Sequence, residues 1–353
     1  METGSTRLLL LCRPGFEKEC LAEITEAAAE RGAYGWSRLE ADSGFVLFET
    51  DQADRLYSQL PQLVFAREAW PVTAELTDLP EKDRVSPILD ALGGQPQGGQ
   101  LFCDTSEGDA YRATARFAGK FVHPLRQAMR GADLLTPKDQ PNQPAWHALF
   151  LDSSHVLLGL DKPEHRPRWP MGVARLKFPP QAPSRSTLKL EEAFHVFLGP
   201  DWRRTMENTH TGVDLGAAPG GWTWQLVNQG LAVQAIDNGP MDEDLMATGQ
   251  VEHLRADGFT WAPDYPVDWL VCDMVEQPAR VAERMLDWLT NGWTRSTIFN
   301  LKLPMKKRWQ TWQGIREQID RRLGDAGVRY HLAAKHLYFD REEITVYLTR
   351  TDA

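Results

Sequence analysis

The pattern of hydrophobic and polar positions changes character near residue 184. Before this point, short apolar runs are mixed with a few stretches of helical periodicity, and this mixture predicts α+β structure. After it, apolar strands alternate with amphipathic helices, which is typical of a parallel α/β sheet. Two proline-rich stretches, 162–170 and 178–183, lie between these parts and indicate an extended connector, since repeated prolines exclude a regular element.

The expected elements follow from these patterns. In the first part we expect strands at residues 8–12, 45–48, 68–73, 101–104, 145–151 and 154–160, and helices at 16–31 and 119–130. In the α/β part we expect strands at 212–215, 231–236, 251–255, 269–272, 296–301, 330–335 and 344–349, and helices at 186–198, 222–229, 279–289 and 308–326. The chain therefore divides into two α+β regions (1–62 and 63–161), a basic proline-rich connector (162–183) and an α/β domain (184–353).

The composition is that of an ordinary globular protein, with 42% hydrophobic and 25% charged residues among 353. No apolar run is long enough to span a membrane, and residues 7–12 are too few for a signal peptide and are expected to form a strand. The four cysteines form no CxxC pair and show no metal-ligand spacing. We therefore expect reduced thiols, no metal site and a cytoplasmic protein.

The formal net charge of −10 is unevenly distributed. Residues 1–100 carry 9 basic and 17 acidic side chains, whereas residues 101–178 carry 11 basic and 8 acidic ones. A second basic segment, 302–322, holds seven basic side chains against two acidic ones. Such local basic surface permits RNA binding without requiring it, because solvated helix faces carry the same charges.

The most informative motif is Asp214-Leu-Gly-Ala-Ala-Pro-Gly-Gly-Trp222, between a predicted strand and a predicted helix. It lacks the Lys-Ser/Thr that completes a phosphate-binding P-loop, and its glycine spacing is not the dinucleotide fingerprint GxGxxG. The remaining interpretation is the D-x-G-x-x-P-G-G loop of methyltransferases that use S-adenosyl-L-methionine, since glycines let a ligand approach the backbone closely. A turn without a ligand is the alternative, although turns rarely need so dense a pattern.

Each part of the cofactor has a candidate partner in this motif or at a following strand end. Backbone amides of Gly220 and Gly221 can receive the methionine carboxylate, and Asp214 either supports the amine or orders the loop. Asp237 is placed for the ribose hydroxyls and Asp257 for the adenine amino group. The candidate cofactor-binding residues are thus Asp214, Gly216, Ala218, Pro219, Gly220, Gly221, Trp222, Asp237, Asp257 and Asp273.

The residues near the fourth strand end limit what can be methylated. Base amino-group methyltransferases carry Asn/Asp-Pro-Pro-aromatic there, and this chain has Asp273-Met-Val. Cys272 and Asp273 point to opposite faces of a strand, so Cys272 is expected in the core and not as a nucleophile. Two acids and two lysines remain as a candidate catalytic set, although a solvated charge is the ordinary role of each: Lys189, Asp273, Lys302 and Glu343.

These four residues, called the tetrad below, together with the glycine loop resemble the K-D-K-E tetrad of FtsJ-like ribose 2′-O-methyltransferases. The strings 184–194, 237–241, 271–274 and 299–307 resemble the members that methylate the 2′-hydroxyl of a cytidine in 23S ribosomal RNA. This resemblance covers nearly the whole chain. It implies a Rossmann-like methyltransferase domain preceded by a ferredoxin-like region and a THUMP-like RNA-binding domain that contains residues 112–120, and it places Ser186 beside the cofactor.

The activity so implied is direct methyl transfer, with Lys302 as the candidate base and with Lys189, Asp273 and Glu343 as its charged neighbours. Strand phase decides between Glu342 and Glu343, and we expect Glu343 to face the cleft. The expected partner is 23S ribosomal RNA that is unfolded or incompletely assembled, because a paired nucleotide cannot enter such a cleft. The alternatives are methylation of another substrate, such as tRNA or a small molecule, and an RNA-binding or assembly protein without activity.

Overall fold

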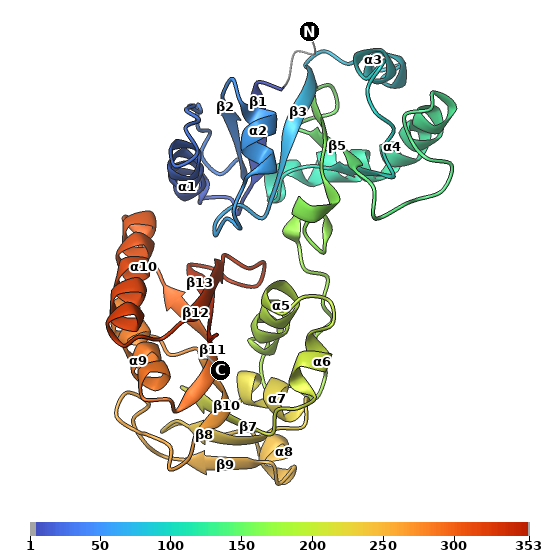
Figure 1. Ribbon diagram of the computed structural model, residues 1–353. Coiled ribbons are helices and arrows are strands. Elements are labelled where there is room, and N and C mark those ends of the chain that lie inside the picture. Colours follow the sequence, from blue (N-terminus) through green and yellow to red (C-terminus); the bar gives the residue numbers. More distant parts are fainter. Residues whose placement is uncertain (1–4, 352–353) are drawn as a thin grey trace. The chain divides into compact units, whose positions relative to one another are not determined.

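The structure is a computed structural model that describes residues 5–351 (Figure 1). It divides into two compact units, unit 1 (Met1–Val173) and unit 2 (Ala174–Ala353), which are described separately. Among residues 5–351, no helix is both long enough and apolar enough to cross a membrane.

Unit 1 is built on one six-stranded sheet with the order β2-β1-β3-β6-β5-β4. Its strands are β1 (Arg7–Leu11), β2 (Phe45–Glu49), β3 (Glu68–Leu76), β4 (Gln100–Asp104), β5 (Ala145–Phe150) and β6 (Val156–Leu160). Its α-helices are α1 (Glu17–Ala29), α2 (Ala53–Ser58), α3 (Val85–Ala91) and α4 (Arg112–Gly131). Only the β4–β5 pair is parallel among these strands, and the central β3 joins the two α+β regions into one sheet.

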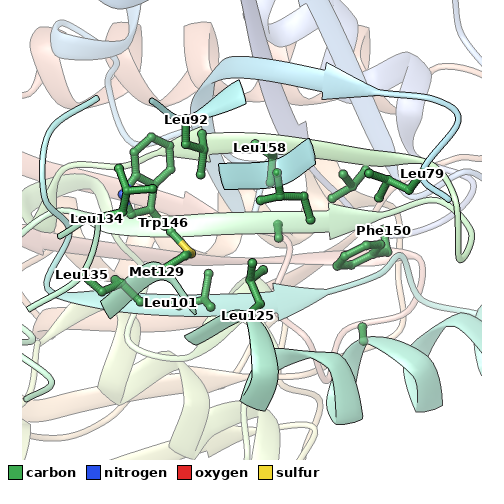
Figure 2. Close-up of a cluster of buried hydrophobic side chains, with 14 residues drawn as sticks. Leu79, Leu92, Leu101, Leu125, Met129, Leu134, Leu135, Trp146, Phe150 and Leu158 are labelled. Atoms are coloured by element: carbon green, nitrogen blue, oxygen red, sulfur yellow. The ribbon is translucent and has the colours of Figure 1, made fainter. Parts of the chain in front are cut away.

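Helix α4 is the element of unit 1 that the hydrophobic pattern predicted least well. It begins at Arg112, seven residues before the expected start, because Phe117 and Ala118 already belong to its apolar face. This face packs on the sheet, where Leu125 and Met129 lie in one buried cluster with Trp146 and Phe150 of β5 (Figure 2). The expected start at residue 119 was therefore wrong, since alanines and polar residues hide the periodicity of the first two turns.

Unit 2 contains a seven-stranded sheet with the order β12-β13-β11-β10-β7-β8-β9. Its strands are β7 (Thr211–Leu215), β8 (Ala232–Ile236), β9 (Val251–Leu254), β10 (Val267–Cys272), β11 (Thr294–Lys302), β12 (Tyr330–Lys335) and β13 (Glu343–Arg350). The expected parallel arrangement is confirmed for β7, β8, β9, β10 and β11, whereas β13 runs antiparallel to both its neighbours. The connection between β12 and β13 is too short for a helical crossover, which is why these strands are antiparallel.

Helices cover both faces of the sheet of unit 2: α5 (Thr187–Phe197) and α7 (Gly221–Val227) on one, α9 (Pro278–Thr290) and α10 (Arg308–Asp325) on the other (Figure 1). Two five-residue helices, α6 (Trp202–Met206) and α8 (Glu243–Ala247), were not expected, because one turn shows no periodicity. The carboxyl ends of the parallel strands and the amino end of β13 meet at one edge. This edge gathers the predicted site residues.

Candidate active site

Asp214 is the penultimate residue of β7, and its side chain is 1% exposed. Its Oδ2 accepts a hydrogen bond of 2.7 Å from the hydroxyl of Thr223, which ties the strand to helix α7. Burial raises the pKa of Asp214 to about 7, against the opposing effect of the Thr223 hydrogen bond. Of the two roles that the sequence left open for Asp214, this arrangement supports the ordering of the loop.

The glycines of the loop are required by contacts within the protein. Gly216 has a φ of +79°, and a Cβ there would lie 2.5 Å from Cγ of Met274. A Cβ on Gly221 would lie 2.2 Å from Oγ of Ser186. The loop therefore packs so closely on its neighbours that side chains cannot fit, a reason that the sequence argument from ligand approach did not consider.

Trp222 and Ser186 are linked by a hydrogen bond of 3.0 Å from the indole Nε1 of Trp222 to the carbonyl oxygen of Ser186. The ring of Trp222 is buried in the core below the loop, so it positions Ser186. The hydroxyl oxygens of Ser184 and Ser186 lie 2.6 Å apart beside Gly221. Gly220, the residue before α7, has no side chain that could cap the helix, and Asp214 accepts a hydrogen bond from the backbone N–H of Thr223. Among the described residues, the N–H groups of Gly221 and Trp222 have no side-chain cap and can serve a ligand.

The carboxylates of Asp237 and Asp257 accept hydrogen bonds from backbone N–H groups of loops at the edge of the sheet where the parallel strands end. Asp237 follows β8, and its two carboxylate oxygens accept hydrogen bonds from the backbone N–H groups of Ala218 (3.0 Å) and Gly239 (2.7 Å). Asp257 is exposed and accepts one from the N–H of Phe259 at 2.9 Å. A carboxylate oxygen has two lone pairs, so both residues can also accept hydrogen bonds from a ligand.

Three members of the tetrad form one ionic cluster. The ammonium group of Lys189, on α5, contacts the carboxylate of Glu343 and lies 3.8 Å from Oδ2 of Asp273. Burial opposes the charge of Lys189, but Asp273 and Glu343 outweigh it and raise its pKa. Burial also disfavours the charge of Glu343, and Lys189 reverses this effect and lowers its pKa. The amine of Lys189 is thus held in its charged form.

Lys302, the fourth member, is the last residue of β11 and the cross-strand partner of Glu343. It is partly buried, and within residues 5–351 it forms no ion pair shorter than 4.0 Å. Burial raises the pKa of Asp273, and the charges of Lys189 and, over a longer distance, Lys302 oppose this rise. Lys302 also adds to the lowering of the pKa of Glu343 by Lys189. The two lysines therefore differ, one in a tight ion pair and the other beside it without one.

Two residues that adjoin the tetrad in the sequence, Glu342 and Cys272, lie in different surroundings from its members. Glu342 is exposed and contacts Arg308, whereas Glu343 is buried against Lys189. Cys272 is fully buried, and burial raises the pKa of its thiol to about 12. This confirms the expected core position of Cys272 and argues against a nucleophilic role.

Four buried polar residues that the sequence did not single out surround the tetrad: Glu192, Asn300, Asp340 and Thr345. Glu192 accepts hydrogen bonds from the N–H groups of Tyr338 (2.8 Å) and Phe339 (3.0 Å), which fixes the loop between β12 and β13. Asn300 and Thr345 stand two positions from Lys302 and Glu343 on the same strands. Polar residues at this spacing in apolar strands were the signal that could have revealed them.

A buried polar cluster in unit 1 has a composition that could hold a metal: Glu68, His147 and Asp161. The ring of His147 lies between the two carboxylates, 3.2 Å from Glu68 and 2.9 Å from Asp161. The guanidinium group of Arg166 also pairs with Asp161, at 2.6 Å. Burial opposes the charge of His147, but Glu68 and Asp161 raise its pKa. Burial also raises the pKa of Glu68, against the opposing charge of His147. The protein's own cationic groups, His147 and Arg166, therefore offset the negative charge of this cluster.

A hollow of about 680 Å³ lies at the other edge of the sheet of unit 2. Its lining comes from the amino ends of β10 and β11 and the carboxyl end of β13, and includes Asp268, Arg295 and Arg350. These residues are remote in the ladder from Lys302 and Glu343. The hollow is therefore separate from the predicted site.

Three family models match the chain. The model described as RlmM ferredoxin-like domain matches residues 5–70, and the model described as Ribosomal RNA large subunit methyltransferase M, N-terminal, matches residues 83–162. The model described as FtsJ-like methyltransferase matches residues 182–293. These matches confirm the ferredoxin-like region and the methyltransferase domain, whereas the THUMP-like character of residues 63–161 and the three boundaries between the four regions stay predictions.

Curated relatives match along nearly the full length. The ribosomal RNA large subunit methyltransferase M of Xanthomonas axonopodis pv. citri is 49% identical over 350 residues, which cover 97% of this chain and 99% of the relative. The protein of the same name from Edwardsiella ictaluri is 48% identical over 351 residues, covering 98% and 94%. That from Yersinia enterocolitica is 47% identical over 354 residues, covering 98% and 96%.

Proposed function

The chain belongs to the ribosomal RNA large subunit methyltransferase M family, and from this premise we propose that it transfers the methyl group of S-adenosyl-L-methionine to the ribose 2′-hydroxyl of a cytidine in 23S ribosomal RNA. The observation that carries the proposal is the difference between the two lysines of the tetrad. Lys189 is fixed in a charged pair, and Lys302 stands next to that pair without a partner within 4.0 Å among the described residues.

The residues around the loop 216–221 fit the cofactor. The uncapped start of α7 offers N–H groups for its carboxylate, and Asp237 offers lone pairs for the ribose hydroxyls. Asp257 serves the adenine amino group, and Asp214 with Trp222 keeps the loop in place. When bound, S-adenosyl-L-methionine supplies a methyl group that its positive sulfur has already activated.

The chain itself must then remove a proton from a hydroxyl that is a poor nucleophile at neutral pH. Lys189 cannot do so, because Asp273 and Glu343 stabilise its charged form. Lys302 is the remaining amine of the tetrad. In its neutral form it would take the 2′-hydroxyl proton and become an ammonium, while the oxygen–methyl bond forms, the sulfur–methyl bond breaks and the spent cofactor leaves as a neutral thioether. With Lys302 neutral, the tetrad carries a net charge of −1, which complements a cationic sulfonium.

Helix α4 supports RNA as the substrate. It contains six basic or histidine side chains and no acidic one, and Arg112, Arg116 and Lys120 lie one turn apart on its exposed face. Arg112 pairs with Asp109 at the surface, an interaction that phosphate can replace. We assign this face to phosphate contacts, which position the RNA while the tetrad selects the ribose hydroxyl.

The state of the RNA and the location are part of the same proposal. The target cytidine has to be unpaired to reach the tetrad, so we assign unfolded or incompletely assembled 23S ribosomal RNA as the substrate. The reaction then takes place in the cytoplasm. The complete tetrad argues against an RNA-binding protein without activity, and the family argues against tRNA as the main substrate.

Two variants of Lys302 test the proposal. RNA from cells that lack the enzyme is incubated with labelled S-adenosyl-L-methionine, and the modified nucleotide is mapped. Lys302→Ala and Lys302→Arg should both lose transfer at least ~100-fold while their cofactor Kd stays near that of the wild type, since arginine keeps the charge but cannot act as a base. Full activity of Lys302→Arg would refute the role as base, and label on tRNA or on a base would refute the substrate.

A further inference from the structure

A buried polar column lies beneath two members of the tetrad. Lys302 and Glu343 face each other across the β11–β13 ladder, and Asn300 and Thr345 are the next pair on the same face. The third member of the column is Asp340, in the loop between β12 and β13, which contacts Thr345. The side chains of Asn300, Thr345 and Asp340 are fully buried, so every polar atom in the column needs a partner within the protein.

Short hydrogen bonds connect the column to the ionic cluster. Nδ2 of Asn300 donates to Oδ1 of Asp273 at 2.8 Å, and Oγ1 of Thr345 donates to Oδ1 of Asn300 at 2.8 Å. Oγ1 of Thr345 also lies 2.9 Å from Oδ2 of Asp340. The N–H of Leu337 donates to this carboxyl group at 3.0 Å. The column therefore runs without a gap from the loop to Asp273.

The number of available hydrogens fixes the direction of these bonds. Asp273 forms an ion pair with Lys189 as a carboxylate, which can only accept, so Asn300 must present its NH2 group to Asp273 and its carbonyl oxygen to Thr345. The single hydroxyl hydrogen of Thr345 is then used on Asn300. The remaining contact, between Thr345 and Asp340, needs a hydrogen from Asp340.

The electrostatic surroundings agree with a proton on Asp340. Burial raises its pKa well above the ordinary value, and Glu343 of β13 and Glu192 of α5 raise it further. Lys189 of α5 opposes this effect but is already paired with Asp273 and Glu343.

We propose that Asn300, Thr345 and an uncharged Asp340 are positioning residues for methyl transfer, which pass hydrogen bonds in one direction to the carboxylate of Asp273. The proton of Asp340 orients the Thr345 hydroxyl, and that hydroxyl orients the amide of Asn300. The amide fixes and stabilises the charged carboxylate of Asp273, which in turn keeps Lys189 charged and leaves Lys302 as the base. This inference rests on the proposed function and adds residues that touch neither substrate nor cofactor.

Matched substitutions test the column through activity. Thr345→Val keeps the shape of the side chain and removes the hydroxyl, so kcat should fall ~10–100-fold while the KM for RNA and the cofactor Kd change little. Thr345→Ser should restore most of the lost kcat. Asp340→Asn still offers one donor and one acceptor, so it should retain far more of kcat than Asp340→Ala. Thr349→Val, further along the same face of β13 and hydrogen-bonded to Ser296, is the control and should behave as the wild type.

Infrared spectroscopy tests the protonation of Asp340 without any methyl transfer. A protonated buried carboxyl group gives a C=O stretch that is separate from the bands of carboxylates, and aspartate labelled with ¹³C identifies it. Asp214, with a pKa of about 7, adds a band of the same kind at neutral pH, so the comparison is made in the Asp214→Asn background. Asp214→Asn should show the band, and the double variant with Asp340→Asn should lack it. Absence of the band in Asp214→Asn, or equal kcat for Thr345→Val and Thr345→Ser, overturns the inference. If the wild type methylates no RNA, the proposed function fails, and the infrared comparison still decides whether Asp340 is protonated.

Discussion

Replacement of Gly216 by alanine should destabilise unit 2 more than the same replacement of an exposed glycine with a similar φ. At a φ of +79°, an alanine costs roughly 1–2 kcal/mol in backbone energy. Its Cβ would also lie 2.5 Å from Cγ of Met274 and 3.3 Å from the Cα of Met274. The methionine side chain can move aside but the backbone cannot do so freely, so overpacking adds about 1–3 kcal/mol.

Gly249 provides the matched control for this substitution. Its φ is +72°, and a Cβ there would meet nothing within 4 Å. Gly249→Ala therefore carries the backbone cost alone, and the difference between the two variants isolates the overlap with Met274. A gap of about 1–3 kcal/mol corresponds to roughly 3–9 °C in Tm for a unit of this size, which thermal unfolding followed by tryptophan fluorescence can resolve.

The same variant should also affect activity, because Met274 directly follows Asp273. A displaced Met274 shifts Asp273 away from Lys189, so Gly216→Ala should weaken cofactor binding in calorimetry and lower kcat, whereas Gly249→Ala should change neither. Equal Tm values for the two variants, with equal cofactor Kd, would falsify the explanation that close packing on Met274 is what requires a glycine.

Three further outcomes follow from the charges of buried groups. Glu343→Gln should lower kcat at least ~10-fold, because Lys189 loses its closest counter-ion, whereas Glu342→Gln should keep wild-type kcat; similar kcat values would contradict the assignment. Asp214, with a pKa of about 7, is neutral at lower pH and attracts a cationic cofactor less, so the cofactor Kd measured by calorimetry should rise as the pH falls through 7. Asp214→Asn should remove this dependence, and a persistent dependence would point to another group. The pKa of His147 is raised in the folded protein, so its charge stabilises the fold fully below pH 6.5, and this stabilisation is lost as the pH rises through the pKa of the folded state. The Tm difference between the wild type and His147→Gln should therefore shrink at alkaline pH. A constant difference would exclude a charged imidazole.

The regular elements of unit 2 were predictable because the apolar runs of its central strands are almost uninterrupted. The run at Val267–Cys272 and the polar Asp273 after it mark both a buried strand and its carboxyl end. Elements of one or two turns, such as α6 and α8, were missed because they are shorter than the period that reveals a helix. The direction of β13 was missed because an apolar run carries no information about which way its neighbours point.

The glycines of the loop have a structural reason that the sequence did not reveal. Close approach of a ligand was the expected reason for glycine, whereas a Cβ on Gly216 or Gly221 would overlap Met274 or Ser186, respectively. Both partners lie far from the loop in sequence, so no local pattern could reveal the contact. The proposed cofactor role is compatible with this packing, because the contacts that demand glycine also hold the start of α7 in place.

The tetrad and the column beneath it illustrate which part of an active site a single sequence can reveal. Lys302 stood out because an ammonium group at the end of a buried strand needs an explanation, and the resemblance supplied one. Asn300 and Thr345 occupy equivalent inward positions one pair deeper, yet uncharged polar residues are common enough in strands to pass unnoticed. Their role depends on the hydrogens that Asp273 and Asp340 can offer, and that question arises only when the ladder sets Asn300 opposite Thr345. The charged groups that we assign to the reaction are therefore visible in the sequence, while the neutral groups that we assign to their support become visible through the pairing of strands.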